Sequence, residues 1–213
     1  MANDGVGISY LDDKQPRCWW CEGHDDYVLY HNAEWACPVD DDRRLFEKIC
    51  LEGFQSGLSW LTILRKREHF RAAFHDFDFH AVAKFKSPQV TRLLKDEGIV
   101  RHRGKIEATI NNAQRAIEME RDFGSLAAWF WQWEPKEQGR VPLTSKAEAY
   151  QRTTCDEAMA MSKALKKLGW KFVGPTTAYA FMQAMGMVND HLIGCSQYDT
   201  VEKLRKKFRR PKS

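Results

Sequence analysis

Two cysteines and two histidines have residue types that could bind a metal. Twelve residues separate Cys18 from His31, and far along the chain His191 and Cys195 have the i, i+4 spacing of one helix face. Two thiolates and two imidazoles make the closed tetrahedral set that structural zinc requires. Neither of these two pairs has a standard zinc-finger spacing, and Cys21 could be the metal ligand in place of Cys18. From spacing alone, four unrelated buried side chains are the simpler interpretation.

The run CWWC at residues 18–21 has the spacing of a redox-active cysteine pair. No alternation of strands and helices surrounds it, which argues against a thioredoxin-like site. The chain also lacks a basic leader with an apolar stretch, so we expect a cytoplasmic location, where thiols stay reduced. Metal ligation or burial therefore explains its cysteines better than redox chemistry does.

Aromatic side chains and one carboxylate form a second candidate site. Trp20, Tyr27 and Tyr30 lie close together in sequence, and Trp60 ends the stretch LEGFQSGLSW. Aromatic faces can hold a flat cationic ring, each contact contributing about 0.5 to 2 kcal/mol. Glu52 lies on a segment whose apolar register points inward, and a buried glutamate needs a partner. A surface glutamate at a frayed helix end is an equally good interpretation from these residues alone.

Two glycine-containing turns could bind phosphate, EGIVRHRGK at residues 97–105 and KFVGPTTAY at residues 171–179. Backbone N–H groups at a helix N-terminus can bind a phosphate without reading a base. The basic residues beside these turns are Arg101, Arg103 and Lys105 at the first and Lys166, Lys167 and Lys171 at the second. Such residues near helix ends are more often simply solvated.

The elements that must position these residues are helical, because apolar residues recur at helical spacing and no stretch alternates with period two. We therefore predict an all-α fold. Expected helices begin after the acidic run 40–42, after Ser59, at Ser87 with Pro88, near Ile106, after Ser125, and at Gly174 with Pro175. A capping box of Thr154 and Glu157 is expected to start the helix that ends at Gly169.

Composition supports a folded globular protein. The chain has 213 residues, of which 43% are hydrophobic and 29% charged, and its longest apolar run is far shorter than a membrane span. The net charge is +4, but residues 201–213 carry seven basic residues and one acidic residue. We expect this basic tail to be a solvated extension that could add weak attraction to phosphate.

Six blocks of sequence resemble the bacterial 3-methyladenine DNA glycosylase I family of the helix-hairpin-helix superfamily. They are YHNAEW, LFEKICLEGFQSGLSW, ILRKRE, GIVRHRGKI, SKALKKLGWKFVG and FMQAMGMVNDHLIGC, and the resemblance runs from about Arg17 to Cys195. It implies one domain over residues 17–196, with residues 1–16 and 197–213 as flexible termini.

The resemblance also implies roles for individual residues. It makes Cys18, His31, His191 and Cys195 the ligands of one structural Zn²⁺ that joins the N- and C-terminal parts. It places Glu52 as the catalytic residue in a base pocket with Trp60, Tyr27 and Tyr30, and Trp20 nearby. It makes KFVGPTTAY the hairpin that holds the DNA backbone through Gly174, Lys171 and Thr176. Asp190 lies near the position of a catalytic aspartate in other superfamily members, but this family is not thought to use it.

The implied function is that of a monofunctional glycosylase, which flips 3-methyladenine out of double-stranded DNA and hydrolyses its N-glycosidic bond in base excision repair. Free 3-methyladenine would be the product. We expect no Schiff-base lysine, no membrane partner, a monomer, and a cytoplasmic bacterial protein associated with the nucleoid when on DNA. The alternative is a zinc-stabilised helical DNA-binding protein without catalysis.

Overall fold

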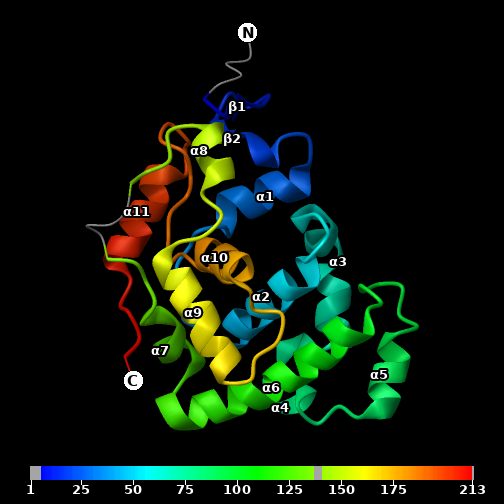
Figure 1. Ribbon diagram of the computed structural model, residues 1–213. Helices are drawn as coiled ribbons and strands as arrows, with labels where there is room; N and C mark the ends of the chain where they lie inside the picture. The colour runs from blue at the N-terminus through cyan, green and yellow to red at the C-terminus, as the bar shows by residue number, and fades with distance from the viewer. Residues whose placement is uncertain (1–5, 137–140, 213) are drawn as a thin grey trace.

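Helix α2 (Asp42–Gln55) lies at the centre of the molecule, with other helices around it (Figure 1). The computed structural model describes residues 6–136 and 141–212. The other helices are α1 (Asp25–Ala33), α3 (Trp60–Ala73), α4 (Phe79–Val82), α5 (Ser87–Leu93), α6 (Arg103–Phe123), α7 (Leu126–Trp131), α8 (Lys146–Gln151), α9 (Asp156–Lys167), α10 (Pro175–Ala184) and α11 (Tyr198–Lys207). Two short 3₁₀ helices, η1 (Trp19–Cys21) and η2 (His75–Phe77), complete the helical part.

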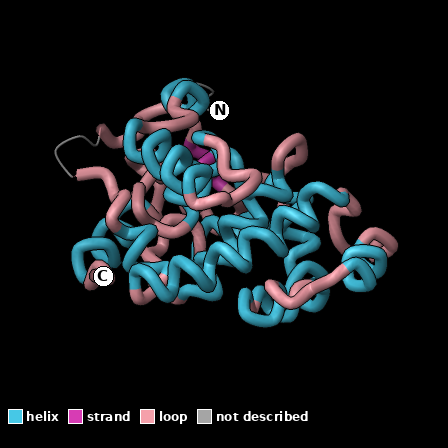
Figure 2. Tube along the Cα trace, turned by 60° about the horizontal axis from the view of Figure 1, so that its bottom comes forward, coloured by secondary structure: helices cyan, strands magenta, loops and turns pink. Residues whose placement is uncertain are grey.

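The predicted helical class is confirmed, with one small addition. Helices account for most of the described chain, and strands form only a short stretch (Figure 2). Strands β1 (Ile8–Tyr10) and β2 (Pro16–Cys18) pair antiparallel, with Ile8 opposite Cys18. Three-residue strands are too short to show a period-two pattern, so the sequence did not reveal them.

The start of α2 confirms the expected acidic cap. The side chain of Asp41 accepts a hydrogen bond from the backbone N–H of Arg44 at 2.8 Å, which satisfies a free donor of the first turn. Leu45, Phe46 and Ile49 are fully buried, so their helical spacing does face the core. The predicted cap Ser59 of α3 is also confirmed, and Ser125, predicted to precede a helix, caps α7 in the same way.

Two details of the predicted elements are wrong. Helix α9 is capped by Cys155, whose sulfur accepts from the backbone N–H of Ala158, and not by a box of Thr154 and Glu157. Lys105 is not a solvated charge beside a phosphate turn. It is buried, and its ammonium donates to the carbonyl oxygens of Phe54 and Ser56 at the end of α2.

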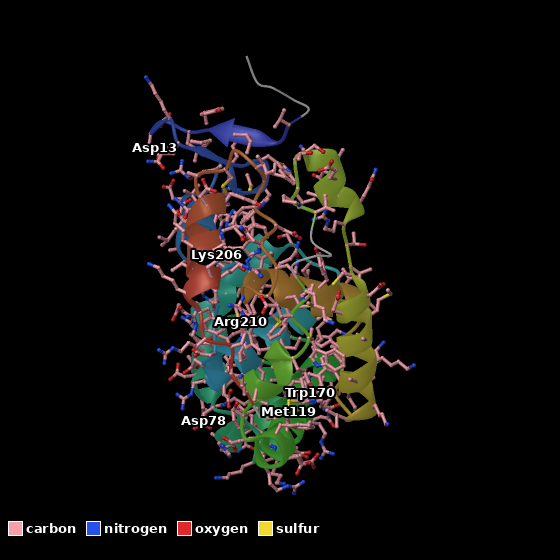
Figure 3. The ribbon with its side chains drawn as sticks, turned by 90° about the vertical axis from the view of Figure 1, so that its left-hand side faces the viewer. Asp13, Asp78, Met119, Trp170, Lys206 and Arg210 are labelled. Atoms are coloured by element: carbon pink, nitrogen blue, oxygen red, sulfur yellow. The ribbon has the colours of Figure 1, made fainter. Side chains whose placement is uncertain are left out.

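The C-terminal segment is not a flexible extension over its described part. Val201 of α11 is buried, and the guanidinium of Arg205 donates to the carbonyl of Gly186 at 2.7 Å and to Glu134 at 2.8 Å. Arg210 also donates hydrogen bonds to Glu134. Figure 3 shows the side of the molecule on which Arg210 lies. The prediction of a flexible terminus at 197–213 missed these contacts, in which Arg205 and Arg210 pair with the partly buried carboxylate of Glu134. Likewise, part of the segment 1–16 forms β1.

The two ends of the domain meet beside the main core. Cys18, Leu143, Leu192 and Cys195 form a small buried cluster separate from the large core around α2. Ile8 of β1 and Ala149 of α8 pack against this cluster, and Figure 1 shows these two elements beside each other. Among the described helices, none has the length and apolar content needed to cross a membrane.

Candidate base pocket and metal centre

Four aromatic residues predicted to form one pocket do lie together. Tyr27 and Tyr30 come from α1, Trp60 is the first residue of α3, and Trp20 belongs to η1. Ring centroids are 5.5 Å apart for Tyr30 and Trp60, and 5.0 Å apart for Trp20 and Tyr27. Trp20 and Tyr27 are half-buried, whereas Tyr30 and Trp60 are buried. The cluster therefore offers aromatic faces at several depths.

Glu52 is buried at the inner side of this cluster. It is 6% exposed, so the interpretation of Glu52 as a surface residue on a frayed helix end is wrong. Burial raises the pKa of both Tyr27 and Tyr30, and the negative charge of Glu52 raises it further. A carboxylate in this position can attract a cationic ring and accept hydrogen bonds from its edge.

Lys48 is the member of the site that the sequence reasoning missed. Its ammonium lies 2.8 Å from Oε1 of Glu52 and donates to the hydroxyl of Tyr30 at 2.9 Å. It also lies 3.2 Å from the centroid of the Trp60 ring. Burial lowers the pKa of Lys48, and the charge of Glu52 opposes that effect. The i, i+4 spacing of Lys48 and Glu52 was the available signal, since such pairs share one helix face.

The two tyrosines of α1 are held in the protonated form. Burial raises the pKa of Tyr27 to about 12, and it raises the pKa of Tyr30 well above its usual value. The carboxylate of Glu52 adds to both effects because a second negative charge nearby is unfavourable. Both phenols therefore remain hydrogen-bond donors at neutral pH.

The four predicted metal ligands come together from both ends of the chain. Their ligand atoms lie within 4.8 Å of one another, and all four residues are buried. The sulfur of Cys195 is 3.5 Å from Nε2 of His31 and 3.6 Å from Nδ1 of His191, and the sulfur of Cys18 is 3.8 Å from the same Nδ1. Zinc bond lengths of about 2.3 Å to sulfur and 2.0 Å to nitrogen put tetrahedral sulfur and nitrogen ligands about 3.5 Å apart. The donor set and its dimensions fit a zinc ion.

The outer ring nitrogens of the two histidines are also in contact with polar atoms. Nδ1 of His31 lies 2.9 Å from the side-chain oxygen of Asn32, and Nε2 of His191 lies 3.4 Å from the carbonyl oxygen of Trp35. Such contacts orient metal-binding imidazoles. Cys21, the competitor of Cys18, is buried with its thiol donating to the Cys18 carbonyl and lies outside the ligand group.

Trp20 connects the two sites. Its ring centroid lies 5.0 Å from that of His31 and 5.0 Å from that of Tyr27. A change at the metal ligands can therefore alter the outer wall of the aromatic pocket through a single side chain.

Helices α9 and α10, which the segment predicted as a hairpin joins, pack against each other in front of α2 (Figure 1). Gly174 is the residue before α10, while Lys171 and Thr176 are exposed on either side of it. The side chain of Asn112 accepts from the backbone N–H of Lys171 at 2.8 Å and donates to its carbonyl at 2.9 Å. Asn112 therefore holds the backbone of this loop in place, and the side chain of Lys171 is exposed.

The other glycine turn is less suited to phosphate. Arg101 pairs with Glu97, and Arg103 pairs with Glu107. With Lys105 buried at the end of α2, the positive charge that the sequence indicated here is largely balanced.

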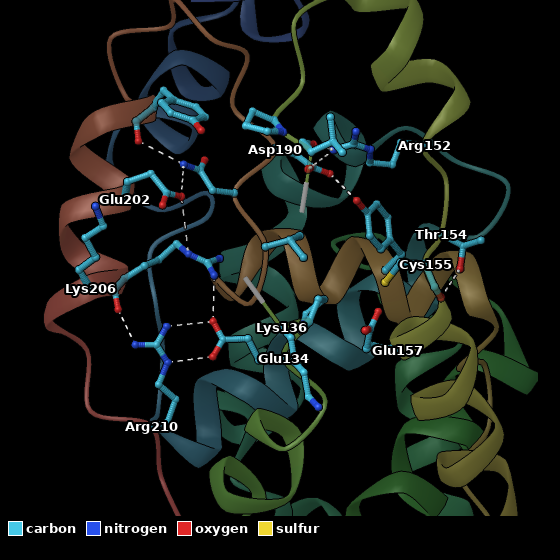
Figure 4. Close-up of a pocket in the computed structure, with 18 residues that line it drawn as sticks. Glu134, Lys136, Arg152, Thr154, Cys155, Glu157, Asp190, Glu202, Lys206 and Arg210 are labelled. Carbon is cyan, nitrogen blue, oxygen red and sulfur yellow. Dashed lines mark hydrogen bonds and ion pairs between the residues drawn. The ribbon is translucent and has the colours of Figure 1, made fainter. Parts of the chain in front are cut away.

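A separate cavity of about 880 Å³ lies between α10, α11 and the segment before α9 (Figure 4). Asp190 lines it and accepts hydrogen bonds from Tyr179 at 2.7 Å and Gln183 at 2.8 Å, with Arg152 at 3.6 Å. Asp190 is therefore fully engaged in structural contacts, and neither Glu52 nor Trp60 lines this cavity.

Comparison with known proteins assigns the chain to a family. A model of methyladenine glycosylase matches residues 20–198. The chain belongs to the methyladenine glycosylase family. It is similar to DNA-3-methyladenine glycosylase 1 of Escherichia coli, at 46% identity over 85% of this chain and 96% of the relative. It is also 41% identical to the DNA-3-methyladenine glycosylase of Haemophilus influenzae, over 84% of this chain and 96% of that protein.

Solved structures of methyladenine glycosylases share the fold. One, a tyrosine-to-phenylalanine variant of 3-methyladenine DNA glycosylase I in complex with 3-methyladenine, superposes with a TM-score of 0.79 at 34% identity, covering 84% of this chain and 95% of that one. Family membership confirms the predicted enzyme class, a hydrolase acting on N-glycosyl bonds, and the predicted helical fold.

Proposed function

We propose that this protein is a monofunctional DNA glycosylase that excises 3-methyladenine from alkylated double-stranded DNA. The observation that carries the proposal is the buried carboxylate of Glu52 among Tyr27, Tyr30 and Trp60, in a chain whose relatives are named for this substrate. The target base must leave the stack to reach such a site.

The chemistry of the lesion explains how a site of this kind can act. Methylation at N3 makes the base of the nucleotide cationic, so it is a good leaving group and needs no strong general acid. Trp60 and the tyrosines would stack on its faces, while Glu52 would bind its edge and stabilise positive charge. A water molecule would then form a bond to the sugar carbon, and the bond between that carbon and the base would break.

Lys48 bears on the expectation of no Schiff-base lysine, because its ammonium lies in the proposed base pocket. A lysine that forms a Schiff base must lose its proton. The ammonium of Lys48 is instead held by Glu52 and Tyr30. We therefore propose hydrolysis without strand cleavage.

Cys18, His31, His191 and Cys195 would hold one structural Zn²⁺, which when bound would fasten strand β2 and helix α1 to the segment after α10. Thiolate and imidazole donors of this kind close a tetrahedral site and leave no position for substrate. The metal would stabilise the fold, and the residues around Glu52 would perform the reaction.

The α9–α10 hairpin would bind DNA as a helix-hairpin-helix element, with one monomer of residues 17–196 acting as the unit. Gly174, Lys171 and Thr176 lie where backbone N–H groups and positive charge are exposed at the start of α10. Phosphate binding there would orient the duplex without reading its sequence.

The experiment that tests the proposed function is incubation of the purified protein with alkylated DNA. We expect free 3-methyladenine in the supernatant, abasic sites in the DNA, and no trapped covalent adduct after borohydride treatment. A zinc-stabilised binding protein without catalysis would retain the DNA and release no base.

A further inference from the structure

Lys48 occupies the same contacts that a cationic base would need. Its ammonium touches the Glu52 carboxylate, the Tyr30 hydroxyl and the face of the Trp60 ring at one point. A purine stacked on that face of Trp60 and bonded to Glu52 would require the same space. The ammonium and the base ring cannot both be there.

We propose that Lys48 is a placeholder cation that determines specificity: it neutralises Glu52 in the free protein, and only a cationic base can replace it there without a large energetic cost. This inference rests on the proposed function and concerns how the same pocket selects its base.

The burial of the pair explains the selectivity. Lys48 and Glu52 have side chains only 7% and 5% exposed. Breaking a buried ion pair by removing one partner is strongly unfavourable, because the remaining charge has no counter-charge. An N3-methylated base brings a positive charge that substitutes for the ammonium. A neutral base would displace the ammonium and leave the Glu52 carboxylate uncompensated.

The structure also offers the ammonium a place to move. A cavity of about 30 Å³ adjoins it, lined by Lys48, Tyr30 and Trp60 together with Glu34 and Glu47. That volume holds about one water-sized group, which an ammonium matches and a purine greatly exceeds. Arg44, Arg67 and Arg71 line the same cavity, and Glu34 and Glu47 pair with Arg67 and Arg71, so the ammonium finds space there but no net electrostatic attraction.

The test compares two adenine probes that differ in charge and by one methyl group at N3, 3,9-dimethyladenine as the cation and 9-methyladenine as the neutral base. Binding is measured by calorimetry and ligand-observed NMR. The proteins are the wild type, Lys48→Gln, Lys48→Met and Lys48→Arg. Without the ammonium, the neutral probe no longer has an ion pair to break, so its affinity should rise by about tenfold in the Gln and Met variants. Lys48→Arg keeps the charge and should retain the wild-type preference for the cation.

The inference is overturned if the neutral probe binds the Gln and Met variants no better than the wild type. It is equally overturned if the cation binds these variants much more weakly, since Lys48 would then support the bound base and not give way to it. Should both variants fail to fold, ¹⁵N NMR of the wild-type lysine ammonium groups decides. Adding the cationic probe should shift the protected Lys48 signal, and an unchanged signal in the saturated complex contradicts displacement.

These outcomes are distinct from failure of the proposed function. If the wild type binds neither probe and releases no base from alkylated DNA, both proposals fail. If it releases 3-methyladenine while the Lys48 variants behave as the wild type does, only the placeholder role is rejected.

Discussion

Nζ of Lys48 and Oε1 of Glu52 lie 2.8 Å apart, one turn from each other on the central helix α2. The pair places opposite charges in the interior beside three aromatic rings. Most of a protein interior avoids such groups, because removing a charge from water is costly unless it is paired. Both residues belong to α2, which lies at the centre of the fold. A change at either one is therefore expected to affect the stability of the domain as well as the chemistry of the pocket.

Removal of a metal ligand should lower stability more than it changes the pocket. Cys195→Ala should lose bound zinc and reduce the free energy of unfolding by about 3 kcal/mol or more, since metal binding contributes directly to folding. Elemental analysis and urea unfolding measure the two effects. The matched control is Cys21→Ala, which removes a buried neighbouring thiol outside the ligand group and should keep the metal. Equal metal content in both variants would contradict the assigned ligands.

The hairpin should contribute to DNA affinity through phosphate. Lys171→Ala should weaken binding about equally for all sequences, and the slope of log affinity against log salt should fall by about one. Fluorescence anisotropy with duplexes of different sequence tests this. Lys206→Ala, an exposed lysine on α11, is the control and should change the slope little. If Lys206 had the larger effect, the DNA-binding surface would lie elsewhere.

The sequence predicted the elements better than it predicted which charged residues are buried. Helix periodicity and caps such as Asp41 and Ser59 depend on local backbone chemistry, so they were readable from short segments. The metal ligands and the base pocket followed only from resemblance, because 159 residues separate His31 from His191. No short-range sequence pattern predicts a contact between residues so far apart in the chain.

Burial of basic residues was the main error. Lys105 and Arg205 were expected to be solvated and Lys48 was not singled out, since lysine and arginine are rarely buried. Each is instead held by partners from another element or by a carboxylate one turn away. Such partners become visible only when the helices are packed.

The ion pairs of α11 should stabilise the domain. Arg205→Ala should cost about 3 kcal/mol, because it leaves the largely buried Glu134 without one of its cations and the carbonyl of Gly186 without a donor. Thermal and urea unfolding measure the loss. Lys206→Ala, the next residue on the same helix, should change stability by less than about 0.5 kcal/mol. Similar values for the two variants would mean that α11 does not contribute through these contacts.

Tyr27 should make stability depend on pH in the alkaline range. Its pKa rises from the ordinary value of 10.0 to about 12 in the folded protein, so the unfolded chain loses the proton first. The stabilisation is complete below about pH 10 and is lost as the pH rises towards 12. Between pH 9 and pH 11, the wild type should therefore lose about 1 kcal/mol more than Tyr27→Phe. Urea unfolding at the two pH values checks this, and an identical loss in both proteins would argue against a shifted phenol.

Excision by way of Glu52 is tested by release of free 3-methyladenine from alkylated duplex DNA by the wild type and by Glu52→Gln. We expect rapid release by the wild type and a rate at least about tenfold lower for the variant, because a hydrogen-bonded carboxylate that stabilises positive charge is lost. Glu134→Gln, which alters another ion-paired glutamate away from the pocket, is the control and should excise the base at close to the wild-type rate. Absence of release by the wild type would contradict the proposed activity, and equal rates for Glu52→Gln and the wild type, with the melting temperature unchanged, would contradict the role of Glu52.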